Sequence, residues 1–81
     1  MADYRYRTTI APVDGLTWSF ADDDQMKAFD LARSSVRAAG DGALAVIERL
    51  VLPEAEHHEP AVVAVLRNHG GHSVKLRGAT D

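Results

Sequence analysis

Residues 22–40, DDDQMKAFDLARSSVRAAG, carry signals for both the start and the end of a helix. Asp22 suits the N-cap position, and Gln25 three residues later completes a capping box. Gly40 suits the left-handed position that follows a last helical turn. Apolar residues recur at three- and four-residue steps, at Met26, Phe29, Ala32, Val36 and Ala39. We therefore predict one amphipathic helix over 22–40 that packs this apolar stripe against a core.

The residues before this helix predict a β-hairpin. In residues 4–10, YRYRTTI, the side chains alternate between two faces, with both tyrosines on one face and both arginines on the other. Residues 12–15, PVDG, have the composition of a turn, and residues 16–20, LTWSF, alternate again. We expect a hairpin with an aromatic inner face that the helix covers.

After the helix, the pattern is open to two interpretations. Aliphatic residues lie three and four positions apart, at Leu44, Ile47, Leu50 and Val51. This spacing predicts a helix over Ala43–Leu52, which Pro53 ends. A strand is the alternative, but it would place Glu48 on the same face as four aliphatic residues.

The next segment is also ambiguous. Pro60 and Gly70 suit the first position and the C′ position of a helix over Ala61–His69. The β-branched residues within it favour strands instead, so a hairpin of Ala61–Arg67 with His72–Arg77 is the alternative.

The C-terminal residues predict a strand that joins the sheet of the hairpin. Within it, we expect Val74 and Leu76 to face inward, and Ser73, Lys75 and Arg77 to face outward. The predicted fold is thus a single small α+β domain over residues 1–81. It has an N-terminal β-hairpin, a central amphipathic helix, one or two short helices and a C-terminal strand.

Composition limits how such a chain is stabilised. A domain of 81 residues buries only about 60–65% of its unfolded surface, so small domains often add disulfides, metals or partner subunits. The chain has no cysteine, which excludes a disulfide framework and a thiolate zinc site. No apolar leader or membrane-spanning run is present, so we expect a cytoplasmic protein without a membrane partner. The net charge of −3 argues against a dedicated nucleic-acid binder.

Histidines and glutamates supply the candidate metal ligands. They gather in the last third of the chain, at His57, His58, His69 and His72, with Glu54, Glu56 and Glu59 between or beside them. Imidazole and carboxylate groups bind zinc or nickel, but these spacings match no known metal motif. We predict no cofactor, and a His-rich metal-binding protein is the third hypothesis. No nucleophile elbow or phosphate-binding glycine loop is present, so we predict no enzyme.

Charge segregation is the most informative functional pattern. The predicted strands carry basic residues and no acidic ones, whereas acidic residues concentrate in 22–24 and 54–59. If the last strand lies beside the first, the outer sheet face becomes basic. Such an asymmetric surface favours docking to a protein partner or between copies. The predicted partner-binding residues are Arg5, Arg7, Lys75, Arg77, Glu54, Glu56 and Glu59.

The order of segments also resembles a known group of proteins. The features that carry the resemblance are Leu16–Phe20, an acidic helix start, an Ala-rich helix and Ala43–Leu52 as a second short helix, and in this order they resemble the small tail-assembly chaperones and neighbouring tail-gene proteins of actinobacterial phages. The resemblance implies a binding or assembly role, and the use of Ala, Arg, Asp and Gly fits a high-GC bacterium or phage.

These patterns together predict a non-enzymatic protein–protein interaction or assembly module, self-associating or phage-related. The alternative is a small nucleic-acid-binding regulator. It would use the basic sheet face, or a helix-turn-helix made from Ala43–Leu52 and Ala61–His69.

Overall fold

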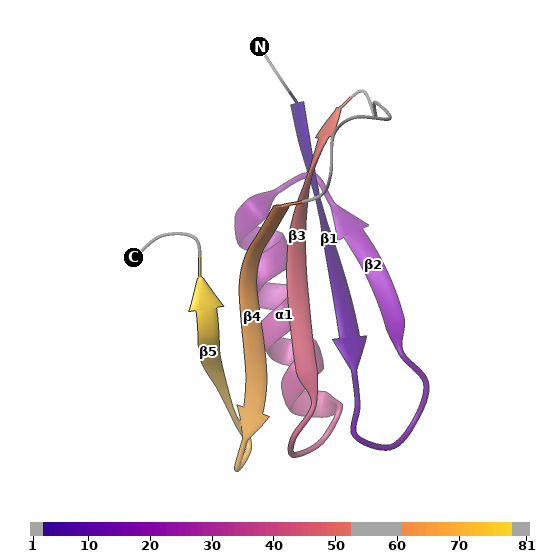
Figure 1. Ribbon diagram of the computed structural model, residues 1–81, viewed down its shortest axis with the longest axis vertical. Helices are drawn as coiled ribbons and strands as arrows, with labels where there is room; N and C mark the ends of the chain where they lie inside the picture. The colour runs from indigo at the N-terminus through magenta and orange to yellow at the C-terminus, as the bar shows by residue number, and fades with distance from the viewer. Residues whose placement is uncertain (1–2, 53–60, 79–81) are drawn as a thin grey trace.

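The computed structural model describes residues 3–52 and 61–78 (Figure 1). These residues form, in chain order, β1 (Asp3–Ala11), β2 (Trp18–Asp22), α1 (Gln25–Ala38), β3 (Leu44–Leu52), β4 (Ala61–His69) and β5 (His72–Gly78).

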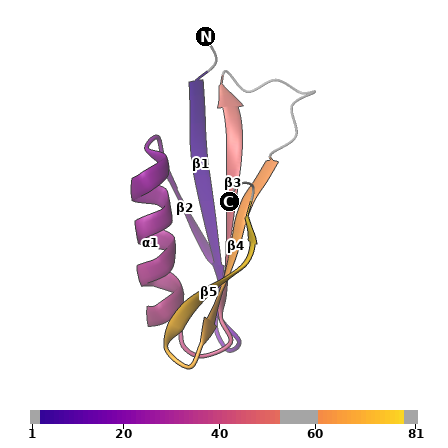
Figure 2. The same ribbon diagram turned by 90° about the vertical axis from the view of Figure 1, so that its left-hand side faces the viewer.

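All five strands belong to one antiparallel sheet, in the order β2-β1-β3-β4-β5. β2 and β3 pair with opposite sides of β1, so they run in the same direction as each other. α1 connects these two strands and lies across one face of the sheet (Figure 1). Figure 2 shows the sheet edge-on, and no other described helix or strand lies on the opposite face.

The core lies between α1 and the sheet. On β1, alternate residues point toward the helix, which buries Tyr6, Thr8 and Ile10. The helix contributes mainly small side chains, so it can pack close to the strands. The other buried core residues are Ala28, Ala32, Val36, Ala43, Ala45, Ile47, Val63, Ala64 and Leu66.

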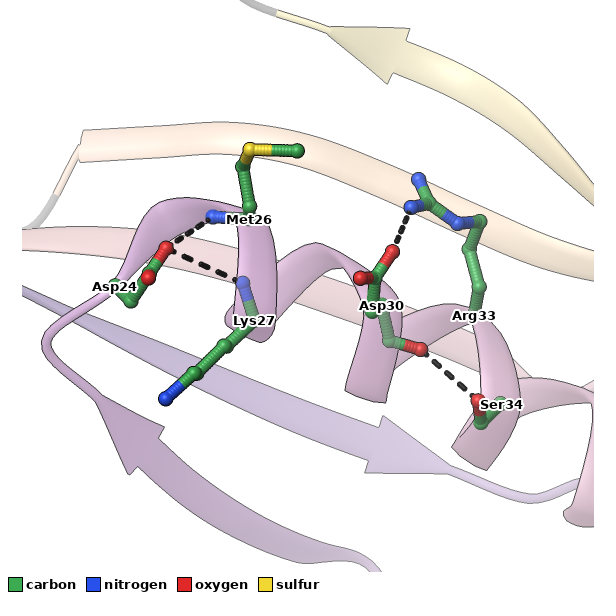
Figure 3. A network of polar contacts seen from close by, with 6 residues as sticks. All are labelled: Asp24, Met26, Lys27, Asp30, Arg33 and Ser34. Carbon is green, nitrogen blue, oxygen red and sulfur yellow. Dashed lines mark hydrogen bonds and ion pairs between the residues drawn. The ribbon is translucent and has the colours of Figure 1, made fainter.

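The predicted helix is present, but it begins later than expected. Asp24, not Asp22, is the N-cap, because its carboxylate accepts hydrogen bonds from the backbone N–H groups of Met26 and Lys27 at 2.9 and 3.4 Å (Figure 3). Asp22 instead accepts a hydrogen bond from the backbone N–H of Asp24 at 2.8 Å. The predicted stripe is only partly correct, since Met26 is 76% exposed.

Asn68 fixes the other end of the helix to the sheet. Its side chain is buried, and its Nδ2 group donates to the backbone carbonyls of Val36 and Arg37 at 3.0 and 3.2 Å. Its Oδ1 atom accepts from the N–H of Gly71 at 2.9 Å, and its backbone exchanges hydrogen bonds with residues 42–43. One buried amide thus satisfies carbonyl groups at the helix end that have no partner within the helix.

The N-terminal hairpin is confirmed, although its second strand is shifted. β2 starts at Trp18, and Leu16 is 90% exposed in the preceding loop. Tyr4 and Trp18 are 41% and 42% exposed, so the expected aromatic inner face is only partly buried. The ring of Tyr4 stacks instead beneath the guanidinium of Arg49, 4.8 Å from its carbon to the ring centroid.

The helix predicted over Ala43–Leu52 is wrong, because this segment forms β3 and pairs along the whole of β1. The sequence disfavours a strand here because a strand places Glu48 on the same face as aliphatic residues. In the structure, Glu48 lies directly opposite Arg7 on β1, and the two side chains form an ion pair. A cross-strand partner therefore accommodates the carboxylate on this face.

The helix predicted over Ala61–His69 is also wrong, and the alternative hairpin is confirmed as β4 and β5. His69 pairs with His72, which leaves a two-residue turn. Gly70 and Gly71 have φ values of +60° and +88°, and a type I′ turn requires positive φ at both positions. The Gly-Gly sequence thus favours this turn over a helix end.

The predicted α+β fold class is therefore wrong. The described residues form mostly a five-stranded antiparallel sheet with a single helix. β5 does not lie beside β1, because β3 and β4 separate them. Its faces are also reversed over residues 73–75, because Lys75 lies opposite the buried Leu66, whereas Val74 is 42% exposed. A register shift then returns Arg77 to the outward position that was predicted for it, opposite Val65. α1 packs mainly against the middle strands of the sheet and less against the edge strand β5. The helix side of β5 therefore does not need a continuous row of apolar side chains.

Candidate interaction surface

The sheet face opposite α1 is the candidate functional surface, and we call it the open face. Strand alternation and register assign its members. They include Arg5, Arg7, Thr9 and Ala11 on β1, Ser19 and Ala21 on β2, Leu44, Val46, Glu48 and Leu50 on β3, Val62, Val65, Arg67 and His69 on β4, and the positions of His72, Val74 and Arg77 on β5.

The middle of the open face is aliphatic. Val46 lies at its centre, with Thr9 opposite on one side and Val65 on the other. The nearest aliphatic residues on the neighbouring open-face positions are Leu44, Val62 and Val74, and Leu50 lies beyond Glu48 on β3. A solvated face of an antiparallel sheet usually carries polar residues, so this aliphatic patch is unusual for a surface that meets only water.

Charged residues surround this patch, and most of them are paired. Both Nε and Nη2 of Arg7 donate to Oε1 of Glu48, at 3.1 and 3.0 Å. Nε of Arg5 donates to Asp23 at 3.2 Å, in a pair that is well exposed. Arg67 is exposed and forms no ion pair within residues 3–52 and 61–78. The open face therefore combines an apolar centre with one unpaired described cation.

The predicted basic residues do not form one continuous patch. Arg5 and Arg7 lie on the open face, and Arg77 occupies an open-face position on β5, opposite Val65. Lys75 occupies a helix-side position, because its partner in the register is Leu66. β3 and β4 lie between the two groups, and β3 brings the carboxylate of Glu48 onto the face.

The predicted acidic partner-binding residues, Glu54, Glu56 and Glu59, lie outside the described residues, as do His57 and His58. His69 and His72 face each other next to the Gly70–Gly71 turn, and both are exposed. In the part of the chain that the structure describes, no group of three or more His, Asp or Glu side chains is placed to hold a metal ion.

A shallow hollow beside the start of α1 is lined by Arg5, Lys27 and residues 21–24. Its carboxylates already have structural roles. Asp24 caps the helix and Asp23 pairs with Arg5. These contacts account for the acidic cluster without a ligand.

The helix-turn-helix expected from Ala43–Leu52 and Ala61–His69 is wrong, because both segments are strands. Among the described residues, no helix is long and apolar enough to cross a membrane. Comparisons of the chain with protein-family models, with curated proteins and with solved structures give no match.

The aliphatic patch is the surface that sequence reasoning missed. Its signal was the run of aliphatic residues at both odd and even positions of 44–52, LAVIERLVL. Such a run is typical of a strand with two apolar faces.

Proposed function

We propose that this chain is a non-enzymatic interaction module that self-associates through its open face. The observation that carries the proposal is the aliphatic patch around Val46, on a sheet face that no described element covers. Burying apolar surface contributes roughly 25 cal/mol per Å², so a contiguous patch of this kind supplies a driving force for association.

The size of the face supports this proposal. Five strands about 4.8 Å apart, with residues about 3.4 Å apart along each strand, give a projected area on the order of 500 Å². Two such faces in full contact bury roughly 1,000 Å², which is near the lower limit for a specific interface. We therefore expect a dissociation constant in the micromolar range.

The charge arrangement favours a protein partner over a nucleic acid. Nucleic-acid affinity depends on unpaired cations that replace counterions along phosphates. On the open face, Arg7 is paired with Glu48 and Arg5 with Asp23, which leaves Arg67 as the one described cation without an ion pair. The remaining surface is largely aliphatic, which suits a protein interface with an apolar centre and a charged rim.

The test is the molar mass in solution across protein concentration. Wild-type protein should change from monomer to dimer in the micromolar range by light scattering. Val46→Lys places a charge at the centre of the patch and should weaken association at least tenfold, because an unpaired charge is costly to bury.

Leu31→Lys is the matched control, because Leu31 is an exposed aliphatic residue on α1, on the other side of the molecule. It should associate as wild type does. Circular dichroism and thermal midpoints establish that both variants fold. A wild-type chain that is monomeric at several hundred micromolar, or a Val46→Lys variant that still associates, contradicts the proposal.

A further inference from the structure

We propose that the partner on the open face is a second copy of this chain. The two copies are related by a two-fold axis that runs parallel to the sheets and crosses above the midpoint between Val46 and Val65. In this dimer, Arg67 of each copy lies over Glu48 of the other. The inference rests on the proposed self-association and adds its geometry, its axis and its charged contacts.

The strand register places these four residues in a symmetric pattern. Val46 on β3 lies directly opposite Val65 on β4. Glu48 lies one open-face position beyond Val46 in one direction along the strands, in the row of Val62. Arg67 lies one open-face position beyond Val65 in the other direction, in the row of Leu44. The midpoint between Glu48 and Arg67 is therefore also the midpoint between Val46 and Val65.

Standard sheet dimensions convert this pattern into a rotation. With strands about 4.8 Å apart and same-face residues about 6.8 Å apart, Glu48 and Arg67 are separated by about 14 Å along a line inclined about 20° to the strands. A two-fold axis that runs parallel to the sheet, lies between the two copies and is perpendicular to this line above its midpoint brings each residue over the other in the second copy.

The crossing angle that results is one that sheets adopt. The axis turns the strands of the two copies by about 40° relative to each other, close to the about 30° of aligned sheet packing. In Figure 1 the open face is toward the viewer, with α1 behind the strands and β3 to the right of β4. A copy placed in front is then rotated clockwise relative to the copy behind, which is the negative sense of aligned packing.

Unused hydrogen-bonding groups support the charged contact. Both hydrogen bonds from Arg7 go to Oε1 of Glu48, and among the described residues none is shown to Oε2. Arg67 is exposed and forms no ion pair within the described ranges. The second copy thus brings a guanidinium to a carboxylate oxygen that can accept it. The same rotation places Val62 of each copy over Val74 of the other, which extends the apolar contact.

A double-mutant cycle on the dimer dissociation constant tests the charged contact. Glu48→Ala and Arg67→Ala should each weaken the dimer about tenfold, because the symmetry removes two contacts at once. The double variant should be no weaker than either single one. Glu48→Ala also removes the pair with Arg7, but this loss occurs in both halves of the cycle and cancels.

Any coupling between these positions is intermolecular, because within one copy they are about 14 Å apart, too far for direct contact. Arg37→Ala, on the exposed surface of α1, serves as the control and should leave the dissociation constant unchanged.

Cross-linking tests the axis itself. The chain has no cysteine, so a single introduced cysteine reacts at one known place. Val46→Cys, next to the axis, should form a covalent dimer with a short bismaleimide. Ala21→Cys lies on the same face but on the edge strand β2, about 20 Å from its own copy across the axis, and should not.

The outcomes separate this geometry from the proposed function. One outcome refutes the two-fold arrangement but leaves self-association intact. In that outcome the wild-type chain is a dimer and Val46→Lys dissociates it, but Glu48 and Arg67 show no coupling and Ala21→Cys cross-links. A monomeric wild type refutes both. Coupling in the cycle, together with selective cross-linking at Val46→Cys, supports the arrangement.

Discussion

Asn68→Ala should be among the most destabilising single substitutions in this chain. The side chain makes hydrogen bonds to two carbonyls at the end of α1 and to one N–H in the β4–β5 turn. Val36 is fully buried, so its carbonyl loses a partner that water does not easily replace, at a cost of about 1–3 kcal/mol. Arg37 and Gly71 are exposed, so water can satisfy their groups, and each adds about 0.5–1 kcal/mol.

The sum is about 3 kcal/mol, a large part of the roughly 5–15 kcal/mol that stabilises a typical domain. For a domain of this length, it corresponds to a decrease of roughly 12–24 °C in the midpoint of thermal unfolding. Urea and thermal unfolding, followed by circular dichroism, measure both quantities. His69→Ala, at the exposed neighbouring position on β4, is the control and should stay within about 0.5 kcal/mol of wild type.

Asn68→Asp adds a dependence on pH. The substitution retains the acceptor for Gly71 but directs a carboxylate oxygen at the carbonyls of Val36 and Arg37. The protonated form can donate, so folding should raise the pKa of the introduced carboxyl group. The variant should therefore be closest to wild type below about pH 4 and lose stability as the pH rises through the folded-state pKa. A loss below about 1 kcal/mol for Asn68→Ala, or no pH dependence for Asn68→Asp, would refute this account of the helix end.

Two further substitutions test the packing around the core. Thr8→Val should leave stability unchanged or raise it by up to about 1 kcal/mol in urea unfolding, because Oγ1 of Thr8 is buried without a hydrogen-bond partner; a loss above about 1 kcal/mol contradicts this. Gly42→Ala should cost more than Gly40→Ala in thermal unfolding. Both glycines have positive φ, but a Cβ at position 42 would lie 2.8 Å from Cγ2 of Val13, whereas nothing lies within 4 Å of one at position 40. Equal losses of stability in the two variants would show that the positive φ, and not the contact with Val13, sets the effect of the substitution.

The sequence predicted best the elements whose signals are local. Apolar spacing and an acidic start identify the helix, but they assign its N-cap to Asp22, the first of three consecutive aspartates. Only the structure shows that Asp24 makes the capping hydrogen bonds. The β1–β2 hairpin followed from alternation around a turn, but the shift of β2 to Trp18 depends on pairing with β1, which no local signal specifies.

The wrong assignment of β3 and the missed interaction surface have the same cause. Periodicity distinguishes a strand from a helix only when one face is polar. In β3 one face packs on α1 through Ala45 and Ile47, and the other carries Leu44 and Val46 on the open face. The residues that obscured the alternation are therefore the residues of the candidate surface. Glu48 seemed out of place only because its partner Arg7 lies about forty positions earlier in the chain.

The strand order also determines how the chain reaches its native state. β1–β2 and β4–β5 close over residues 12–17 and 70–71, so each hairpin forms at a small entropic cost. The central β1–β3 ladder joins two strands that are separated in the sequence by the whole of β2 and α1. Its formation therefore has the largest loop-closure entropy cost of the strand pairings. We therefore expect substitutions in the β1–β3 ladder to slow folding, and substitutions in the outer hairpin β4–β5 to act mainly on the rate of unfolding.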